Sequence, residues 1–328
     1  MKRGRMAVLG ATGILGKQLL EALEAKGLPS ESLTLLASER SEGEEVSYGG
    51  DSLWIERMGP TALKGIDLAL LALPRGVAAQ AVLWAEQAGI GVMDFSGGSP
   101  PQIPLLSPHA LGKEGPQWPS GKPQVSLASP LAQVLACMLF PLKPFGRIEA
   151  TALCGAACLG QAGVRALEKQ TLALLNGREP EVEGGHRQAF NLLPAFEGEA
   201  GGGGFAHPAE AEVPMELERL LGGPVALGLH VFFAPFFFGV SMSFSVAIEG
   251  GRGLEHWREA LASGYGIKIL EDKEHGLYPM PLLISQDSSL LVGKLRLQDN
   301  ILRGVLAFEP ALWVAEFAAN LAMVGVGA

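Results

Sequence analysis

The chain opens with a change in the spacing of its apolar residues that predicts a strand followed by a helix. Met6–Leu9 is a continuous apolar run, which is typical of a buried strand. Leu19, Leu20 and Leu23 then recur at the spacing of one helix face, up to Gly27, a residue type that often follows a helix directly. The pattern therefore predicts a strand, a tight turn and an amphipathic helix.

The same alternation continues through the first third of the chain. Leu33–Leu36, Leu68–Leu73 and Gly91–Phe95 predict further buried strands, and Ala78–Ala88 predicts the helix between the last two. Strands that alternate with helices in this order form a parallel sheet. We therefore expect an α/β protein whose first domain is a Rossmann-type parallel sheet.

The second half shows apolar and polar residues alternating along two strands, Val225–Phe233 and Met242–Ile248. They predict a sheet covered by helices on one side only, hence a domain of the α+β type. These strands hold more apolar side chains than one layer of helices should cover. Since monomers rarely expose a large apolar face, we expect a homodimer in which two copies of this domain pair through it.

Composition narrows the choice of partners. The chain has 328 residues, enough for two domains, and its formal net charge of -9 argues against nucleic acid. Its most apolar run, Val231–Val240, is too short to cross a membrane and contains Pro235. Cys137, Cys154 and Cys158 are few and odd in number, which fits a reducing compartment. We expect a cytoplasmic protein without a nucleic-acid or membrane partner.

The turn after the first strand has the spacing of a dinucleotide-binding loop. Gly10 permits a tight turn, Gly13 lets the backbone approach a pyrophosphate, and Gly16 lets the helix pack on the strand. The helix N-terminus that follows offers N–H groups to an anion. The candidate cofactor-binding residues of this turn are Gly10, Ala11, Thr12, Gly13, Ile14, Leu15 and Gly16. The alternative is a glycine-rich turn that no longer holds a nucleotide.

The end of the second predicted strand is the second candidate cofactor site. In doubly wound folds this strand end meets the adenosine ribose, where a carboxylate accepts from the 2′-OH and an arginine suits a 2′-phosphate. Glu39 and Arg40 favour opposite cofactors, NAD and NADP respectively. Ser38, Arg40 and Ser41 are the candidate residues, and the alternative for Arg40 is a solvated surface charge.

Short motifs in the same order along nearly the whole chain resemble those of the aspartate-semialdehyde dehydrogenases, most of all their Usg-type paralogues. The motifs are Gly10–Gly16, Asp94-Phe95-Ser96, Gly163–Gln170, Ala189–Pro194, Tyr278–Pro281 and Val292–Arg296. The resemblance implies a nicotinamide cofactor, with the Ser-x-Arg-Ser-x-Gly pattern around Arg40 favouring NADP. It implies a domain of residues 1–125 plus a C-terminal helix at 310–328, and a dimerisation domain at 126–309.

The catalytic residues that the resemblance predicts are missing. Family members attack the aldehyde with a cysteine thiolate, transfer hydride to the nicotinamide and release the thioester to phosphate, with histidine as general base. In this chain Ala132 stands at the cysteine position and Val240 at the histidine position. Cys154 and Phe233 stand at the glutamine and arginine positions that hold the substrate. The sequence therefore predicts no catalytic residue at any of these four positions.

Two further anion-binding positions also differ from the family. Glu210 matches a family glutamate, but Glu212 stands where a phosphate-binding lysine is expected, which reverses the charge. The segment Gly97–Pro100, after Asp94-Phe95-Ser96, offers no arginine for the second oxyanion.

Other side chains give weak support for a substitute site. Cys154 and Cys158 are near the old nucleophile position, but a free thiol in apolar surroundings is mostly protonated. The six histidines show no metal-ligand spacing, so we expect no metal. Glu199–Gly204 is a glycine-rich tract that we expect to be a mobile loop.

Two hypotheses remain. In the first, the chain keeps the dehydrogenase frame and perhaps its NADP or NAD site, acts by binding a dinucleotide or small ligand, and lacks the phosphorylating aldehyde dehydrogenase activity. In the second, it is an active NAD(P)-dependent oxidoreductase of amino-acid biosynthesis that acts on another aldehyde or oxo group with a rearranged site. The absence of an acid–base residue at the family positions favours the first.

Overall fold

The computed structural model divides the chain into two compact units. Unit 1 comprises Met1–Ser129 and Val314–Ala328, and unit 2 comprises Pro130–Trp313; the sequence analysis placed these boundaries at 125/126 and 309/310. The tract Glu199–Gly204 lies outside the described residues, so its expected mobility is not addressed. The structure describes residues 4–97, 100, 102–110, 118–119, 121, 123–182, 186–195 and 209–327.

Unit 1 is built on an eight-stranded sheet in the order β3-β4-β2-β1-β5-β6-β8-β7. All neighbouring strands are parallel except the β3–β4 pair. From β1 the chain adds strands β2 and β4 on one side and β5 and β6 on the other. This is the doubly wound arrangement of Rossmann-type folds. The strands are β1 Met6–Leu9, β2 Leu33–Ala37, β3 Glu45–Tyr48, β4 Asp51–Arg57, β5 Leu68–Leu71, β6 Gly91–Asp94, β7 Leu105–Leu106 and β8 Gln124–Leu127.

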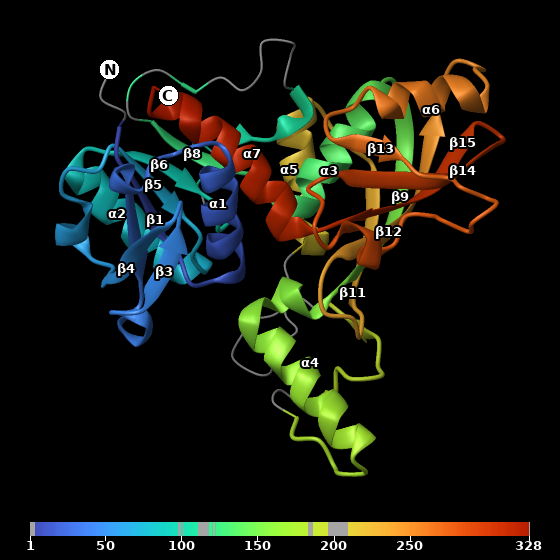
Figure 1. Cartoon of the computed structure of the whole chain (residues 1–328). Coiled ribbons are helices and arrows are strands. Elements are labelled where there is room, and N and C mark those ends of the chain that lie inside the picture. Colours follow the sequence, from blue (N-terminus) through green and yellow to red (C-terminus); the bar gives the residue numbers. More distant parts are fainter. Residues whose placement is uncertain are drawn as a thin grey trace. The chain divides into compact units, whose positions relative to one another are not determined.

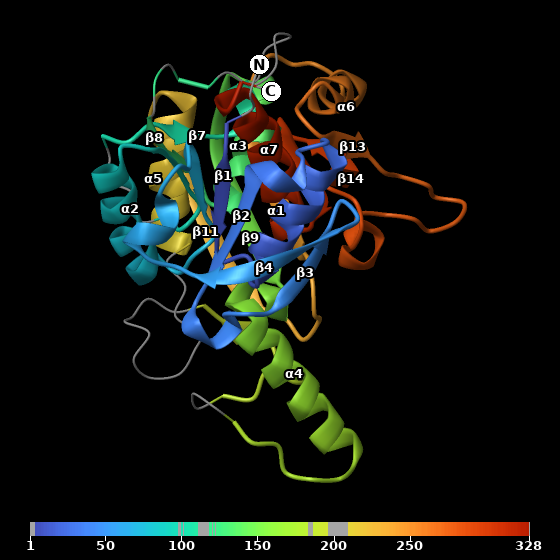
Figure 2. The same ribbon diagram turned by 60° about the vertical axis from the view of Figure 1, so that its left-hand side comes forward.

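Helices α1 (Ile14–Ala25) and α2 (Arg75–Ala88) cover opposite faces of this sheet (Figures 1 and 2). Ala81 and Ala85 of α2 pack on alternate residues of the strands, among them Ala7 and Leu9. All four residues of β1 are fully buried, as their continuous apolar run predicts. The predicted strands and both helices are confirmed, although α2 begins three residues earlier than expected.

The β3–β4 hairpin was not predicted from the sequence. Its turn, Gly49-Gly50, has positive φ at both residues, a combination that suits hairpin turns. One face of the hairpin carries polar residues and Trp54, which is 62% exposed. On the other face Val46, Tyr48, Leu53 and Ile55 alternate with them, and Tyr48 and Ile55 are buried. The sequence therefore contained a period-2 signal that our prediction did not use.

Unit 2 is built on a seven-stranded, mixed sheet in the order β10-β11-β9-β12-β15-β14-β13. The strands are β9 Phe145–Cys154, β10 Leu193–Pro194, β11 Leu227–Phe233, β12 Val240–Ile248, β13 Ile267–Ile269, β14 Leu290–Gln298 and β15 Ile301–Phe308. The helices are α3 Pro130–Leu139, α4 Gly160–Leu175, α5 Ala209–Leu221 and α6 Leu254–Ala262. Helix α5 packs against α3 and β11, and α6 against β13 and β14. Figure 1 shows α4 extending away from this sheet.

The two faces of the unit 2 sheet differ in polarity. Along β12, Val240, Met242, Phe244, Val246 and Ile248 are buried, whereas Ser241, Ser243, Ser245 and Ala247 are exposed or partly exposed. Residues Glu149 and Thr151 of β9 occupy the same open face. Leu153, Phe232 and Val305 also lie on this face and are partly exposed. The open face is therefore mixed, with the serines of β12 interrupting its apolar residues.

The last helix, α7 (Pro310–Gly325), follows β15 directly and is confirmed at the expected place. It begins in unit 2 and continues into unit 1. Within unit 1 it is tied to α1 by an ion pair between Glu316 and Lys26, with Oε1 and Nζ 2.7 Å apart. Among the described residues, no helix is long and apolar enough to span a membrane.

Candidate functional site

The glycine turn after β1 is too crowded for side chains at two of its three glycines. Gly10 has φ of +86°, and a Cβ there would lie 2.2 Å from the Ala72 carbonyl oxygen. A Cβ on Gly16 would lie 2.1 Å from the Gly10 carbonyl oxygen. A Cβ on Gly13 would meet only that same oxygen, at 3.2 Å, and otherwise open space. Gly10 and Gly16 are therefore required by close packing, as expected. At Gly13 there is open space through which a ligand can approach the backbone.

Helix α1 begins at this turn without a side-chain cap. Its N-cap residue is Gly13, no side chain bonds to the first N–H groups, and the first turn carries no acidic residue. The first N–H groups of a helix have no partner inside the helix and carry partial positive charge. An anion such as a pyrophosphate therefore fits here without displacing a carboxylate.

The segment after β2 contacts the glycine turn. Ser41 Oγ lies 3.4 Å from Thr12 Oγ1, which brings two predicted cofactor-binding segments together. Ser38 is the residue before the short 3-10 helix Glu39–Ser41, and its side chain makes no capping hydrogen bond. Glu39 pairs with Arg57, with Oε2 and Nη2 3.3 Å apart. Arg40 is exposed and has no ion pair within the described part of the chain, so its charge is available to an anion.

In unit 2, three of the four positions that the motif alignment assigns to family catalytic residues form one row across neighbouring strands. Cys154 of β9 pairs with Phe233 of β11 on one side and with Val240 of β12 on the other. Directly paired residues of neighbouring strands point to the same face of a sheet, here the covered face. They are 3%, 0% and 1% exposed. Three positions chosen by motif alignment thus prove to be spatial neighbours.

The fourth family position lies on a buried helix of the same unit. Ala132 is in the first turn of α3 and is fully buried, and Leu131 beside it is 6% exposed. The side chains at the four positions are a methyl group, a thiol, a phenyl ring and an isopropyl group. None of them is charged, and only the thiol bears an exchangeable proton.

Glu210, which matches a family glutamate, has a structural contact in this chain. Its Oε1 accepts a hydrogen bond from the backbone N–H of Val231, at 2.7 Å, and ties α5 to β11. His230 Nδ1 lies 3.9 Å from the same oxygen. Glu212, where a lysine is expected, is on the same helix and partly exposed.

The loop after β6 is anchored by its own residues and by an arginine from α2. Ser96 donates from its backbone and from its hydroxyl to the buried Asp94 carboxylate, at 2.9 and 3.0 Å. Arg75 Nη2 donates to the Gly97 carbonyl oxygen at 3.1 Å. The sequence analysis did not consider Arg75, because it lies at the start of α2, far from this loop in the sequence. Gly98 and Ser99 lie outside the described residues.

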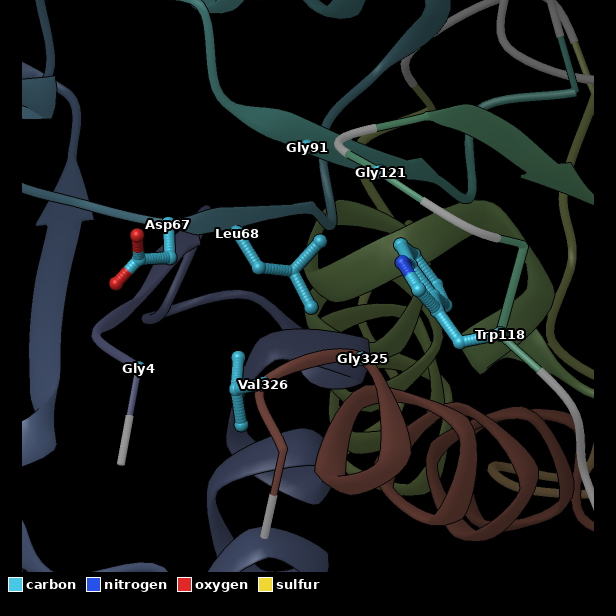
Figure 3. A pocket seen from close by; sticks show the side chains of 8 residues that line it. All are labelled: Gly4, Asp67, Leu68, Gly91, Trp118, Gly121, Gly325 and Val326. Atoms are coloured by element: carbon cyan, nitrogen blue, oxygen red, sulfur yellow. The ribbon is translucent and has the colours of Figure 1, made fainter. Parts of the chain in front are cut away.

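A cavity of about 320 Å³ in unit 1 lies at the opposite edge of the sheet from the glycine turn. Asp67, Leu68 and Gly91 place it at the amino ends of β5 and β6. In Figure 3 the Trp118 indole lies beside Gly325 of α7. Because doubly wound sheets bind ligands at the carboxyl ends of their strands, this cavity is separate from the candidate dinucleotide site.

Glu309 is a buried acid that the sequence analysis missed. It follows β15, next to Phe308, which pairs with Val240 of the row. It is 6% exposed, and its Oε2 atom has no hydrogen-bond partner. Burial raises the pKa of its carboxyl group, against hydrogen bonds from the backbone of Ala311 and Gly239. A glutamate between an apolar strand and Pro310 was the available signal. Among the described residues, no group of three or more His, Cys, Asp or Glu side chains has the geometry of a metal site.

Comparison with known proteins agrees with the fold. Residues 5–110 match the family described as semialdehyde dehydrogenase, NAD binding domain. A "USG-1 protein homolog" from Azotobacter vinelandii is 33% identical over 274 residues, covering 81% of this chain and 80% of the relative. An "Aspartate-semialdehyde dehydrogenase" from Aquifex aeolicus is 27% identical over 324 residues, covering 94% and 92%.

Two solved structures share the fold across the whole chain. Aspartate semialdehyde dehydrogenase II from Vibrio cholerae, complexed with ASA, has a TM-score of 0.86 at 21% identity, and covers 99% of this chain and 98% of that one. The enzyme from Candida albicans with NADP has a TM-score of 0.67 at 16% identity, and covers 98% and 97%. The chain belongs to the semialdehyde dehydrogenase family, whose members include aspartate-semialdehyde dehydrogenases and USG-1 homologues.

Proposed function

We propose that this chain binds a nicotinamide dinucleotide and lacks phosphorylating semialdehyde dehydrogenase activity. The observation that carries the proposal is the row of Phe233, Cys154 and Val240, which are side by side on a covered sheet face and uncharged. With Ala132 at the nucleophile position, the chain has no family group to attack the aldehyde, none to accept the proton, and none to hold the substrate carboxylate.

The dinucleotide part of the proposal rests on unit 1. The uncapped start of α1 and the approachable Gly13 suit the pyrophosphate, while Ser41 and Arg40 suit the adenosine end. A bound dinucleotide would supply or accept a hydride in an active relative. In this chain we expect binding alone, which calorimetric titration with NADP and NAD measures directly. Absence of binding to either cofactor would contradict this part.

Replacing Arg40 tests which cofactor the site prefers. If Arg40 holds the 2′-phosphate, Arg40→Ala should weaken NADP binding about tenfold, because a hydrogen bond to a charged group contributes about 1.5 kcal/mol or more. NAD binding should change little, since NAD has no phosphate there. Both affinities can be measured by calorimetry on the same preparation.

Lys64→Ala provides a matched control for Arg40→Ala. Lys64 is exposed and precedes β5, at the opposite edge of the sheet from the glycine turn. Its removal takes away one positive charge and should leave both affinities unchanged. Equal losses of NADP and NAD in Arg40→Ala would show that the side chain does not read the 2′-phosphate.

We also propose that the protein is a homodimer built through unit 2, as the family resemblance implies. The pairing would use the open sheet face, which carries Ser243, Thr151 and Glu149 beside the partly exposed Phe232 and Val305. Light scattering at micromolar concentration should give about twice the chain mass. The mass of a single chain under these conditions would refute the proposal.

One observation favours a second function, an oxidoreductase with a rearranged site. The Cys154 thiol and the Glu309 carboxyl are polar groups at the end of the row where family members hold substrate. A screen of small aldehydes and oxo acids with NADPH separates the two functions. Steady turnover of one of them, abolished by Glu309→Gln, would favour the second.

A further inference from the structure

Two of the three cysteines are neighbours at the end of the row described above. Cys154 is the last residue of β9, and Cys158 is in the 3-10 turn Ala156–Leu159 that follows. Only one tight turn separates them, and their side chains are close enough to interact. Cys154 is buried, whereas Cys158 is partly exposed. The pair therefore has one thiol that a reagent can reach and one directly behind it.

The backbone holds this turn in place. The N–H of Cys158 donates to the Gly155 carbonyl oxygen at 3.0 Å, which folds the four-residue step back on itself. Gly155 and Ala156 donate to the carbonyl oxygens of Gly239 and Phe236, at 2.9 and 2.8 Å. A Cβ on Gly155 would lie 2.9 Å from the Phe236 ring. Backbone hydrogen bonds thus fix the turn between the two cysteines, and none of them involves a thiol.

The surroundings of Cys158 keep its thiol protonated. The interaction with the Cys154 side chain is the largest cause that raises the pKa of Cys158, followed by burial, and the charges of Cys154 and Glu309 raise it further, against a backbone hydrogen bond from Gly155. A protonated thiol is a poor nucleophile. These neighbours, Glu309 among them, therefore slow any reaction of Cys158 that needs the thiolate.

We propose that Cys154 and Cys158 form a redox-active thiol pair that low-molecular-weight disulfides convert into an intramolecular disulfide. The inference concerns this chain's own sulfur atoms, and it is independent of whether the chain binds a dinucleotide. The turn that the pair closes leads directly into helix α4, so oxidation fixes the junction of the sheet and this helix.

The reaction proceeds by two thiol–disulfide exchanges. Cys158 loses its proton to solvent through its exposed side, and its sulfur attacks the disulfide R–S–S–R. A mixed disulfide between Cys158 and R forms, and one R–S⁻ leaves and takes up a proton. The Cys154 sulfur, after losing its own proton, then attacks the Cys158 sulfur and releases the second R–S⁻. Two protein thiols are oxidised, and one small disulfide is reduced to two small thiols.

Oxidised glutathione and mass spectrometry under non-reducing conditions test the proposal on the full-length protein. We expect the intact mass to fall by two hydrogen atoms, with both lost from the peptide that contains Cys154 and Cys158. Cys154→Ala should stop at a stable glutathione adduct on Cys158. Cys158→Ala should form neither product. Thermal unfolding of each variant shows that it is folded.

Two matched variants complete the test. Cys137 is 1% exposed on α3, so Cys137→Ala should leave the reaction unchanged. Glu309→Gln keeps the shape of the side chain and removes its charge, and should speed the reaction by roughly threefold to tenfold, because a larger fraction of Cys158 is then thiolate. Glutathione adducts on both thiols, no loss of hydrogen from the wild-type protein, or slower reaction in Glu309→Gln would overturn the proposal.

Discussion

Purified protein supplied with aspartate semialdehyde, phosphate and NADP will accumulate no measurable NADPH. The reaction needs a thiolate to attack the aldehyde and a base to accept a proton, and the motif alignment assigns Ala132 and Val240, 0% and 1% exposed, to those positions. Removing the members of a catalytic set costs a factor on the order of 10⁶ in kcat. From an ordinary rate of about 10 per second, the loss leaves no detectable turnover.

The assay follows the absorbance of the reduced nicotinamide, with an active aspartate-semialdehyde dehydrogenase as positive control. A matched variant, Ala132→Cys, restores the thiol alone and should stay inactive, because Val240 still supplies no base and Phe233 no positive charge. A wild-type rate within about tenfold of ordinary enzymes would show that another residue performs the chemistry.

Gly16→Ala should damage both the stability of unit 1 and its dinucleotide site. The added Cβ would lie 2.1 Å from the Gly10 carbonyl oxygen and 2.9 Å from backbone atoms of Ala11. All of these are backbone atoms, which cannot swing aside as the end of a flexible side chain can, so the turn itself has to move. We expect a loss of about 3 kcal/mol in the free energy of unfolding, the upper range for overpacking, and at least about tenfold weaker NADP binding. Denaturant unfolding and calorimetry measure these two quantities.

Gly76→Ala is the control with the same chemical change. Gly76 is also in the first turn of a helix, α2, but a Cβ there meets nothing within 4 Å. Alanine has a higher helix propensity than glycine, so this variant should gain roughly 0.5 to 1 kcal/mol. If Gly16→Ala is as stable as Gly76→Ala, the close packing at the glycine turn is not required.

The parallel sheet of unit 1 was predictable because its strands are buried on both faces. Such strands have continuous apolar runs, and Met6–Leu9 and Leu68–Leu71 show them without interruption. The β3–β4 hairpin was missed although Gly49-Gly50 marked its turn and Val46, Tyr48, Leu53 and Ile55 alternate with polar residues along its strands. Two short strands with one buried face give a weaker signal than a continuous apolar run.

The two faces of the unit 2 strands were only partly predictable. Met242, Phe244 and Val246 alternate with serines, so a period of two already assigns them to one face of β12. Phe232 and Val305 lie on the same face as these serines, and this depends on the register between strands, which no local pattern encodes.

The site was only partly predictable. Motif order gave Cys154, Phe233 and Val240 as the positions of the missing catalytic groups, but not that they pair across three strands. That pairing depends on the register between segments nearly 80 residues apart in the chain, which no local pattern encodes. Glu309 belongs to the same region for the same reason: β15 pairs with β12, and its end meets the row.

The central claim, a dinucleotide-binding frame without family catalysis, is tested most directly by a single experiment with protein in excess of NADPH. Binding is followed by nicotinamide fluorescence, and aspartyl phosphate, the acyl phosphate that the family reaction forms from aspartate semialdehyde, is then added. We predict that the fluorescence reports a bound nicotinamide and then stays constant, because no hydride leaves. Two results would contradict the account. One is oxidation of the NADPH at the rate shown by an active aspartate-semialdehyde dehydrogenase, and the other is no binding signal at any concentration.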